Sequence, residues 1–333
     1  MLKISAEKIN ELFDKIASQQ TLYIPVDRED KQAEYKKYES GMTLSKALNT
    51  VRSAKDFFFP QTENLAEFKL SGKTIEVKDI RKENEDFVVF GVRACDAKSF
   101  EILDNVFLSE PVDSFYKSRR ENGVIVTMAC NEPEETCFCG AFGINAANPQ
   151  GGDVTTWLAG DTLYWKAETA KGEELTKSIA NLLESAGDSD EKKVEETQAS
   201  IKAILDKLPL KDLDLSYFSG ENLTTKLNDV FYAEQWDELY KACLACGTCT
   251  FVCPTCQCYD IRDFDTGHGV KRFRCWDSCM FSDFTKCAHG NPRTSQKERF
   301  RQRFMHKLVY YPANNGGLYS CVGCGRCLAK CPV

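Results

Sequence analysis

The sequence lacks the segments that would place a protein in or across a membrane. Its longest apolar runs, such as FVVF at 87–90, are far too short to span a bilayer. The N-terminal stretch MLKISAEKINELFDK alternates charged and apolar residues and contains no signal-peptide core. We therefore expect a cytoplasmic protein without membrane attachment.

The sequence also lacks the motifs of nucleotide-dependent and hydrolytic enzymes. No strand is followed by G-x-G-x-x-G, and G-x-x-x-x-G-K-[ST] is absent, so no FAD or NAD site is recognised in this chain. No carboxylate pair and no nucleophile–base set stands out. An excess of positive charge is missing too. The net charge of −7 argues against general nucleic-acid binding, because phosphate backbones attract basic proteins.

Cysteine, in contrast, is abundant. The chain has 17 cysteines in 333 residues, while its 42% of hydrophobic and 28% of charged residues are ordinary for a globular protein. Because cytosolic thiols are kept reduced, these cysteines are not expected to form a disulfide framework. Thiols in this number indicate metal ligands, for iron–sulfur clusters or for zinc.

The first part of the chain has the pattern of an α/β domain. FVVFGV (87–92) and GVIVTMA (123–129) read as buried strands on either side of a helical pattern at 97–107, which predicts a βαβ unit. Further expected elements are an amphipathic helix at 5–18, a strand at 21–26, core packing of 57–59 at a strand end, a hairpin over 155–168, and a polar loop or solvated helix over 184–200.

A domain boundary is predicted near residue 220. Helical patterns at 201–208 and at about 225–241 lie on either side of it, and the second leads into a run of cysteines. We expect an α/β domain over 1–220, followed over 221–333 by a mainly helical, ferredoxin-like domain that holds two [4Fe–4S] clusters. A length of 333 residues is sufficient for two domains with their own cores.

Two cysteine motifs with identical spacing carry the strongest signal. A first triplet (Cys243, Cys246, Cys249) is followed by Cys253, and a second triplet (Cys321, Cys324, Cys327) is followed by Cys331; each motif reads C-x2-C-x2-C-x3-C-P. In two-cluster ferredoxins the fourth cysteine of such a motif ligates the other cluster. The first triplet with Cys331 and the second triplet with Cys253 are therefore the predicted ligand sets. Zinc sites instead use paired C-x2-C knuckles.

A third set of cysteines is predicted in the N-terminal domain: Cys95, Cys130, Cys137 and Cys139. Cys95 follows one buried strand, Cys130 follows the next, and ETCFCG supplies the other two. If the strands are parallel neighbours, these sulfurs meet at the carboxyl edge of the sheet, where α/β proteins place their sites. A third cluster is the favoured interpretation. A zinc site and four separately buried thiols are the alternatives.

The remaining cysteines lie between the two triplets, together with His268 and His289. One interpretation is a further metal site of Cys256, Cys258 and Cys279 with His289 or Cys275; the other is small apolar packing around the clusters. Two basic segments, KRFR (271–274) and PRTSQKERFRQRFMHK (292–307), are also found here. One interpretation is that these segments are solvated surface. The other is that they offset the negative charge of thiolate-bound clusters or bind an acidic partner.

The combined motifs resemble a known family. The segments are GVRACDAKSFEILD, VIVTMACNEPEETCFC, CLACGTCTFVCPTCQCY, CWDSC and CVGCGRC. From near residue 3 to the end, they look like the iron–sulfur beta subunit of cytosolic [NiFe] sulfhydrogenases and like the A-type subunit of anaerobic sulfite reductases. The family pattern has counterparts of the third set and of Cys256, Cys258, Cys279 and His289. Cys275 and Cys287 depart from it, so they are left out as ligands. Family chains continue beyond the last Cys-Pro, so the resemblance implies that the helix over the second cluster is shortened or missing.

A cluster-rich chain without a two-electron cofactor passes single electrons, which predicts an electron-transfer subunit and not a complete enzyme. The resemblance implies partners on both sides: a flavoprotein that oxidises or reduces NAD(P)H, and a catalytic subunit of hydrogenase or sulfite reductase type in an anaerobic complex. Two alternatives remain. One is a stand-alone enzyme with substrate chemistry at the third set, and the other is a zinc-stabilised scaffold module.

Overall fold

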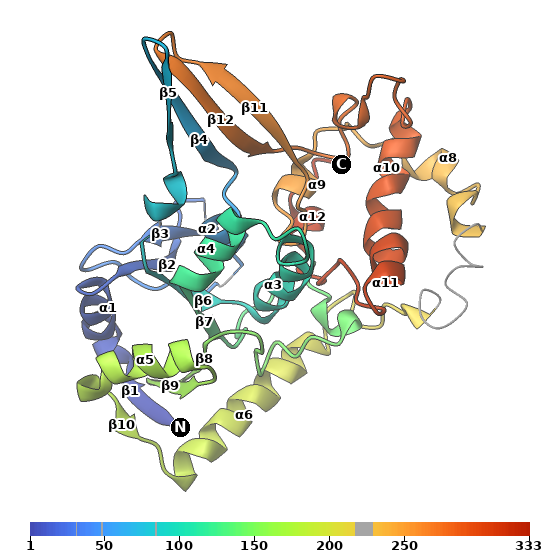
Figure 1. Ribbon diagram of the computed structural model, residues 1–333. Coiled ribbons are helices and arrows are strands. Elements are labelled where there is room, and N and C mark those ends of the chain that lie inside the picture. Colours follow the sequence, from blue (N-terminus) through green and yellow to red (C-terminus); the bar gives the residue numbers. More distant parts are fainter. Residues whose placement is uncertain (31, 48, 84, 217–228) are drawn as a thin grey trace.

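The computed structural model describes residues 1–333 except 31, 48, 84 and 217–228, and it contains two β-sheets with helices packed around them (Figure 1). The boundary predicted near residue 220 falls outside the described residues, as do residues 225–228 of the second predicted helix. Within the described part, no helix is both long and apolar enough to cross a membrane.

The larger sheet has eight strands in the order β10-β1-β9-β8-β7-β6-β2-β3. These are β1 Leu2–Ser5, β2 Thr21–Asp27, β3 Ala33–Lys37, β6 Phe87–Val92, β7 Gly123–Met128, β8 Val154–Ala159, β9 Thr162–Ala167 and β10 Glu184–Ser185. Its centre is parallel: β2 pairs with β6, β6 with β7, and β7 with β8. The predicted βαβ unit is confirmed, because β6 and β7 are parallel neighbours. The predicted hairpin is also confirmed, as the antiparallel pair β8–β9.

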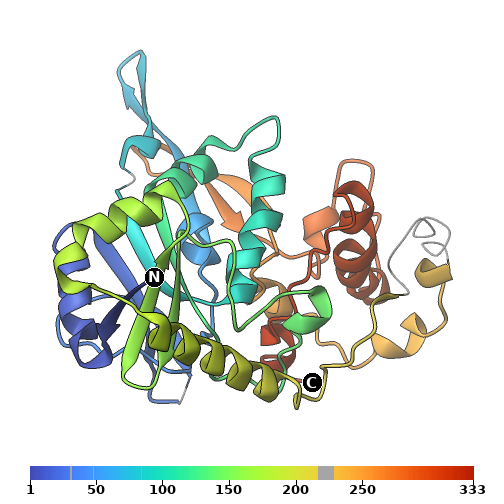
Figure 2. The same cartoon turned by 90° about the horizontal axis from the view of Figure 1, so that it is seen from below.

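Helices cover both faces of this sheet, because alternate strand residues point to opposite sides. Val88 and Phe90 of β6 pack with Phe13, whereas Phe87 and Val89 pack with Phe100 on the other face. The helices here are α1 Ile9–Ala17, α2 Lys55–Phe58, α3 Ala94–Phe107, α4 Ser114–Asn122, α5 Ala170–Ser178 and α6 Asp188–Leu205. Of the two possibilities for 184–200, the helix is confirmed. Figure 2 shows α6 extending from the sheet towards the C-terminal region.

Residues 57–59 lie in the core as expected, but not at a strand end. Phe58 and Phe59 are fully buried in the core on the α3 side of the sheet. Phe58 ends the short helix α2, so the strand prediction is wrong. The reason is a long-range contact: the Lys55 ammonium at the start of α2 donates to the carbonyls of Cys253 and Cys256, about two hundred residues later in the chain.

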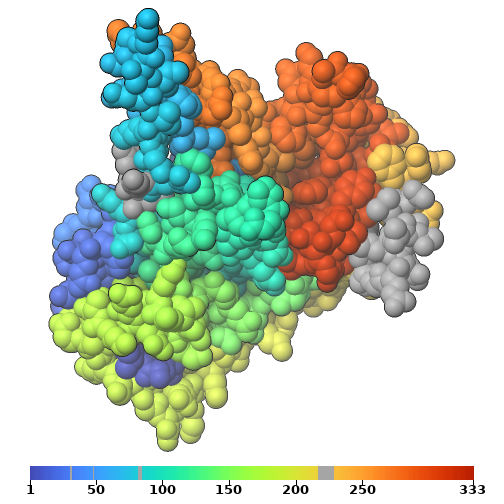
Figure 3. Space-filling model, viewed as in Figure 1, coloured from blue at the N-terminus to red at the C-terminus, as the bar shows by residue number. Residues whose placement is uncertain are grey.

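The smaller sheet joins an N-terminal hairpin and a C-terminal hairpin in one antiparallel structure, in the order β11-β12-β4-β5. Its strands are β4 Thr62–Ser71, β5 Thr74–Lys78, β11 Tyr259–Asp265 and β12 Gly269–Trp276. The sheet projects from the body as an arm (Figures 1 and 3). The C-terminal region thus contributes two long strands, and its predicted mainly helical character is not confirmed.

Short helices carry the cysteine motifs of the C-terminal region. They are α8 Trp236–Leu239, α9 Thr248–Phe251, α10 Gln296–Met305, a π-helical turn at His306–Tyr310, α11 Tyr311–Asn314 and α12 Arg326–Ala329. α9 lies within the first cysteine motif and α12 within the second, and the two helices pack against each other. This pairing brings together cysteines that are some eighty residues apart in the sequence.

Candidate metal centres

The third set assembles where β6 and β7 end. Cys95 lies in the first turn of α3, which follows β6, and Cys130 follows β7. Cys137 and Cys139 come from the loop that leads into a short 3-10 helix. All four are between 3% and 6% exposed, and they line one small cavity. The structure therefore brings together the four cysteines that the strand ends and the C-x-C motif single out.

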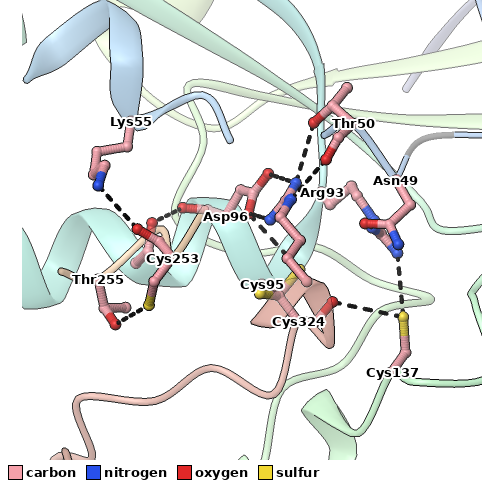
Figure 4. A network of polar contacts seen from close by, with 12 residues as sticks. Asn49, Thr50, Lys55, Arg93, Cys95, Asp96, Cys137, Cys253, Thr255 and Cys324 are labelled. Atoms are coloured by element: carbon pink, nitrogen blue, oxygen red, sulfur yellow. Dashed lines mark hydrogen bonds and ion pairs between the residues drawn. The ribbon is translucent and has the colours of Figure 1, made fainter. Parts of the chain in front are cut away.

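A buried arginine faces this set. Arg93 separates β6 from α3, and its Nη2 lies 3.4 Å from Cys130 Sγ. The same nitrogen lies 3.6 Å from Cys137 Sγ (Figure 4). The Nη1 of Arg93 donates to Asn49, while its buried Nε has no hydrogen-bond partner among the residues that the structure describes. Burial by itself lowers the pKa of Arg93, and the sulfurs of Cys130 and Cys95 more than offset that effect. The guanidinium is thus a fixed positive charge beside the sulfurs.

The second triplet meets Cys253 in the interior. Burial raises the pKa of the Cys321 thiol to about 11 and that of Cys324 to about 12, and the Cys253 sulfur contributes in the same direction to both. Such mutual effects require sulfurs that lie close together. The Cys253 sulfur also acts on Cys249 of the first triplet, so it lies near both groups, and its exchange to the second triplet stays a prediction.

The first triplet meets Cys331 at the surface. Cys243, Cys246, Cys249 and Cys331 line one cavity of about 320 Å³, whose wall also includes Cys327 of the second triplet. The rim is apolar, with Leu239, Leu244, Phe304 and Leu328. Cys246 and Cys331 are exposed, in contrast to the buried third set. The first triplet is thus the cysteine group nearest to solvent.

Three of the four residues of the predicted further site lie together. Contact with Cys258 lowers the pKa of Cys279 to about 7, and contact with Cys279 raises the pKa of Cys258, to which burial and the Cys256 sulfur add. His289 lies in the exposed turn that a hydrogen bond closes between Cys287 and Gly290. Among the described side chains, none of these three cysteines is hydrogen-bonded to His289. The structure brings the cysteines together, but not the histidine.

Buried cations surround all of these sulfurs. Lys55 Nζ donates to the carbonyls of Cys253 at 2.9 Å and Cys256 at 3.0 Å, and Arg303 Nη1 lies 3.6 Å from Cys256 Sγ. Lys307 Nζ donates to Thr255 and to the carbonyl of Ser320. Arg303 and Lys307 both belong to the basic segment 292–307, so part of that segment points inward, towards the sulfurs.

The charge state of these buried cations indicates whether the cysteines are suited to hold a negatively charged group. Among the described residues, neither Lys55, Arg93, Arg303 nor Lys307 forms a salt bridge with a carboxylate, although all four are buried. A buried charge is costly unless a counter-charge lies near it. Thiolates bound to iron–sulfur clusters supply that negative charge. Within the described part of the chain, no three His, Cys, Asp or Glu side chains are arranged to hold a single metal ion.

Sequence reasoning missed several residues of these centres. Arg93 and Arg326 are visible beside the cysteines in VRACD and CGRC, and their position there is a usable signal. Lys55 has no such signal, because it reaches Cys253 only through the tertiary fold. Cys275 lies on β12 in the arm, and Cys287 donates to the Gly290 carbonyl in an exposed turn. The structure places neither of them in the three sets.

The sequence is similar to known iron–sulfur proteins. Residues 242–333 match the family model of a 4Fe-4S dicluster domain, so this chain is an iron–sulfur protein. Its whole length also aligns with sulfhydrogenase 2 subunit beta of Pyrococcus furiosus, with 31% identity over 339 residues that cover 100% of this chain and 94% of that protein. The chain therefore belongs to the family of iron–sulfur beta subunits of sulfhydrogenase type, which transfer electrons. No solved structure matches it.

Proposed function

We propose that this chain relays single electrons between an NAD(P)H-linked flavoprotein subunit and a catalytic subunit in a cytoplasmic, anaerobic oxidoreductase complex. The catalytic subunit is of hydrogenase or sulfur reductase type, or of sulfite reductase type, and electrons flow in either direction. The observation that carries the proposal is the continuity of the three cysteine groups. Cys327 lines the cavity of the first triplet, and Cys324 lines the cavity of the third set.

The proposed ligands follow from the arrangement of the sulfurs. The first triplet with Cys331, the second triplet with Cys253, and the third set would each hold one [4Fe–4S] cluster. Such clusters supply one-electron chemistry at potentials near roughly −400 mV, although their range is wide. The further site at Cys256, Cys258, Cys279 and His289 is not included, because His289 is exposed.

The alternative of substrate chemistry at the third set has little support. A substrate must reach the reacting atoms, and the four cysteines are nearly inaccessible. Turnover by the isolated chain with a sulfur or sulfite substrate, without partner subunits, would favour that alternative.

Iron and sulfide analysis of the anaerobically purified chain tests the proposal. We expect about twelve irons per chain for three [4Fe–4S] clusters, and about sixteen if the further site also holds one. A brown protein that bleaches on reduction is expected. Fewer than about eight irons, or a colourless protein that contains zinc, would contradict even the two clusters of the dicluster domain.

A second prediction concerns the charge beside the third set. Replacing Arg93 with methionine should lower the reduction potential of that centre by tens of millivolts. The guanidinium N–H groups and charge stabilise the more negative, reduced state, and about 1.4 kcal/mol of lost stabilisation corresponds to about 59 mV for one electron. A redox titration followed by paramagnetic resonance measures the shift.

Arg93→Lys is the matched control, because it keeps the positive charge, and its shift should be smaller than that of Arg93→Met. If the potential of the third set is unchanged or rises in Arg93→Met while its iron content is intact, the role given to this arginine is wrong.

A further inference from the structure

The two triplets have the same backbone but different surroundings. Ala245 and Gly323 occupy the same place in the two motifs and adopt φ of 55° and 57°. The preceding residues show the difference: Leu244 is 67% exposed, whereas Val322 is 2% exposed. The first triplet thus faces solvent, and the second is covered by another part of the chain.

The covering segment is the loop of the third set. Residues 136–139 lie directly against residues 323–325, and the Phe138 amide donates to the Gly323 carbonyl at 2.8 Å. A Cβ on Gly323 would lie 2.5 Å from the Phe138 carbonyl oxygen, and a Cβ on Gly325 would lie 2.5 Å from that of Thr136. We call this backbone-to-backbone contact the seam. No side chain fits within it.

The conformation of Gly323 does not by itself require glycine. Ala245 shows that the same loop accepts a Cβ at nearly the same positive φ. What excludes a Cβ at position 323 is therefore the Phe138 carbonyl across the seam. The glycine at position 323 allows the two loops to approach closely.

The seam brings ligands of two groups together. Cys137 Sγ lies 3.8 Å from the carbonyl oxygen of Cys324, and Figure 4 shows these two residues facing each other. Cys324 also lines the cavity of the third set. Only the backbone of Cys324 separates a sulfur of the third set from a sulfur of the second triplet.

A buried ion pair holds the seam beside these cysteines. Arg326 Nη1 and Nη2 bind the two oxygens of Asp96 at 2.5 and 2.7 Å, and Arg326 Nε donates to the Thr50 carbonyl at 2.7 Å. Asp96 follows Cys95, and Arg326 precedes Cys327. The first triplet has Thr248 at the position of Arg326. The second triplet thus differs from the first at the residues that contact the N-terminal part of the chain.

We propose that the seam is the electron crossing between the centre of the second triplet and the centre of the third set. Gly323, Gly325 and the Asp96–Arg326 pair are positioning residues that fix its length. The inference rests on the proposed function. One electron would cross between the group held by Cys324 and the group held by Cys137, in either direction: one group would be oxidised and the other reduced, with no proton moved and no covalent bond changed.

Gly323→Ala tests the crossing, because its Cβ must push the two loops apart. In the purified, fully reduced full-length chain, we expect both centres to be present by iron content and paramagnetic resonance. The magnetic interaction between them should be weakened or lost. When the oxidised protein is mixed rapidly with dithionite, the signal of the third set should appear more slowly than in the wild type.

Gly143→Ala is the matched control. Gly143 lies in the same N-terminal loop region and has a φ of +70°, but no atom lies within 4 Å of its added Cβ. It tests positive-φ strain without a clash and should behave as the wild type. If Gly323→Ala loses iron, the double variant Asp96→Asn/Arg326→Gln, which replaces the ion pair with two amides, is measured in the same way and should also weaken the interaction.

The outcomes separate the two proposals. A wild-type chain without an iron–sulfur centre at the third set contradicts the proposed function itself. The other outcome begins with a wild-type chain that contains all three centres. If the magnetic interaction and the reduction rate are then unchanged in iron-replete Gly323→Ala or in the double variant, only the proposed crossing is wrong.

Discussion

Replacing Cys331 with serine is expected to remove the centre of the first triplet and to leave that of the second triplet in place. Cys331 lies only four residues after Cys327, yet it lines the cavity of Cys243, Cys246 and Cys249. The packing of α9 against α12 brings the two motifs together, as the predicted exchange requires, and a hydroxyl is a poor substitute for a thiolate on iron. About four irons per chain should be lost, as measured by iron analysis and paramagnetic resonance.

Cys287→Ser is the control for this change. Cys287 is exposed and its thiol donates to the Gly290 carbonyl, away from the cysteine groups, so the iron content should stay at the wild-type value. Cys253→Ser should have the converse effect and remove the centre of the second triplet. Survival of the first-triplet centre in Cys331→Ser, with loss of the other, would mean that each motif binds its own cluster.

The parts of the fold that were predictable from the sequence are those that local pattern determines. β6 and β7 are continuous apolar runs because both faces of a central parallel strand are buried. Their parallel pairing then places Cys95 and Cys130 at one edge of the sheet. The grouping of the first triplet with Cys331 follows from motif spacing alone and stays a prediction, and the structure adds that these four cysteines line one cavity together with Cys327.

The parts that were not predictable depend on long-range contacts. β12 pairs with β4, about two hundred residues earlier in the chain, and this pairing forms the arm. Lys55 joins the centres because α2 packs near Cys253. The seam likewise needs two loops that are far apart in the sequence. The glycines of CVGCGRC are visible in the sequence, but what lies opposite them is not.

Replacing Arg326 with alanine should destabilise the protein strongly, by about 3–5 kcal/mol, because it leaves the Asp96 carboxylate buried without a counter-charge. Both residues of this pair are 1% exposed in their side chains. Since bound clusters complicate two-state analysis, the midpoint of thermal unfolding of the iron-replete chain, under anaerobic conditions, is the suitable measurement. A large decrease is expected.

The chain contains a matched surface pair for comparison. Arg272 binds Asp263 with two bonds of 2.8 Å, and both side chains are about half exposed. Because exposed ion pairs contribute only about 0–1 kcal/mol, Arg272→Ala should change the midpoint little. Asp96→Asn/Arg326→Gln should recover part of the stability lost in Arg326→Ala, since it removes both charges together. If Arg326→Ala and Arg272→Ala have equal unfolding midpoints, the buried Asp96 carboxylate is tolerated without its counter-charge. The Asp96–Arg326 pair would then not be what holds the seam together.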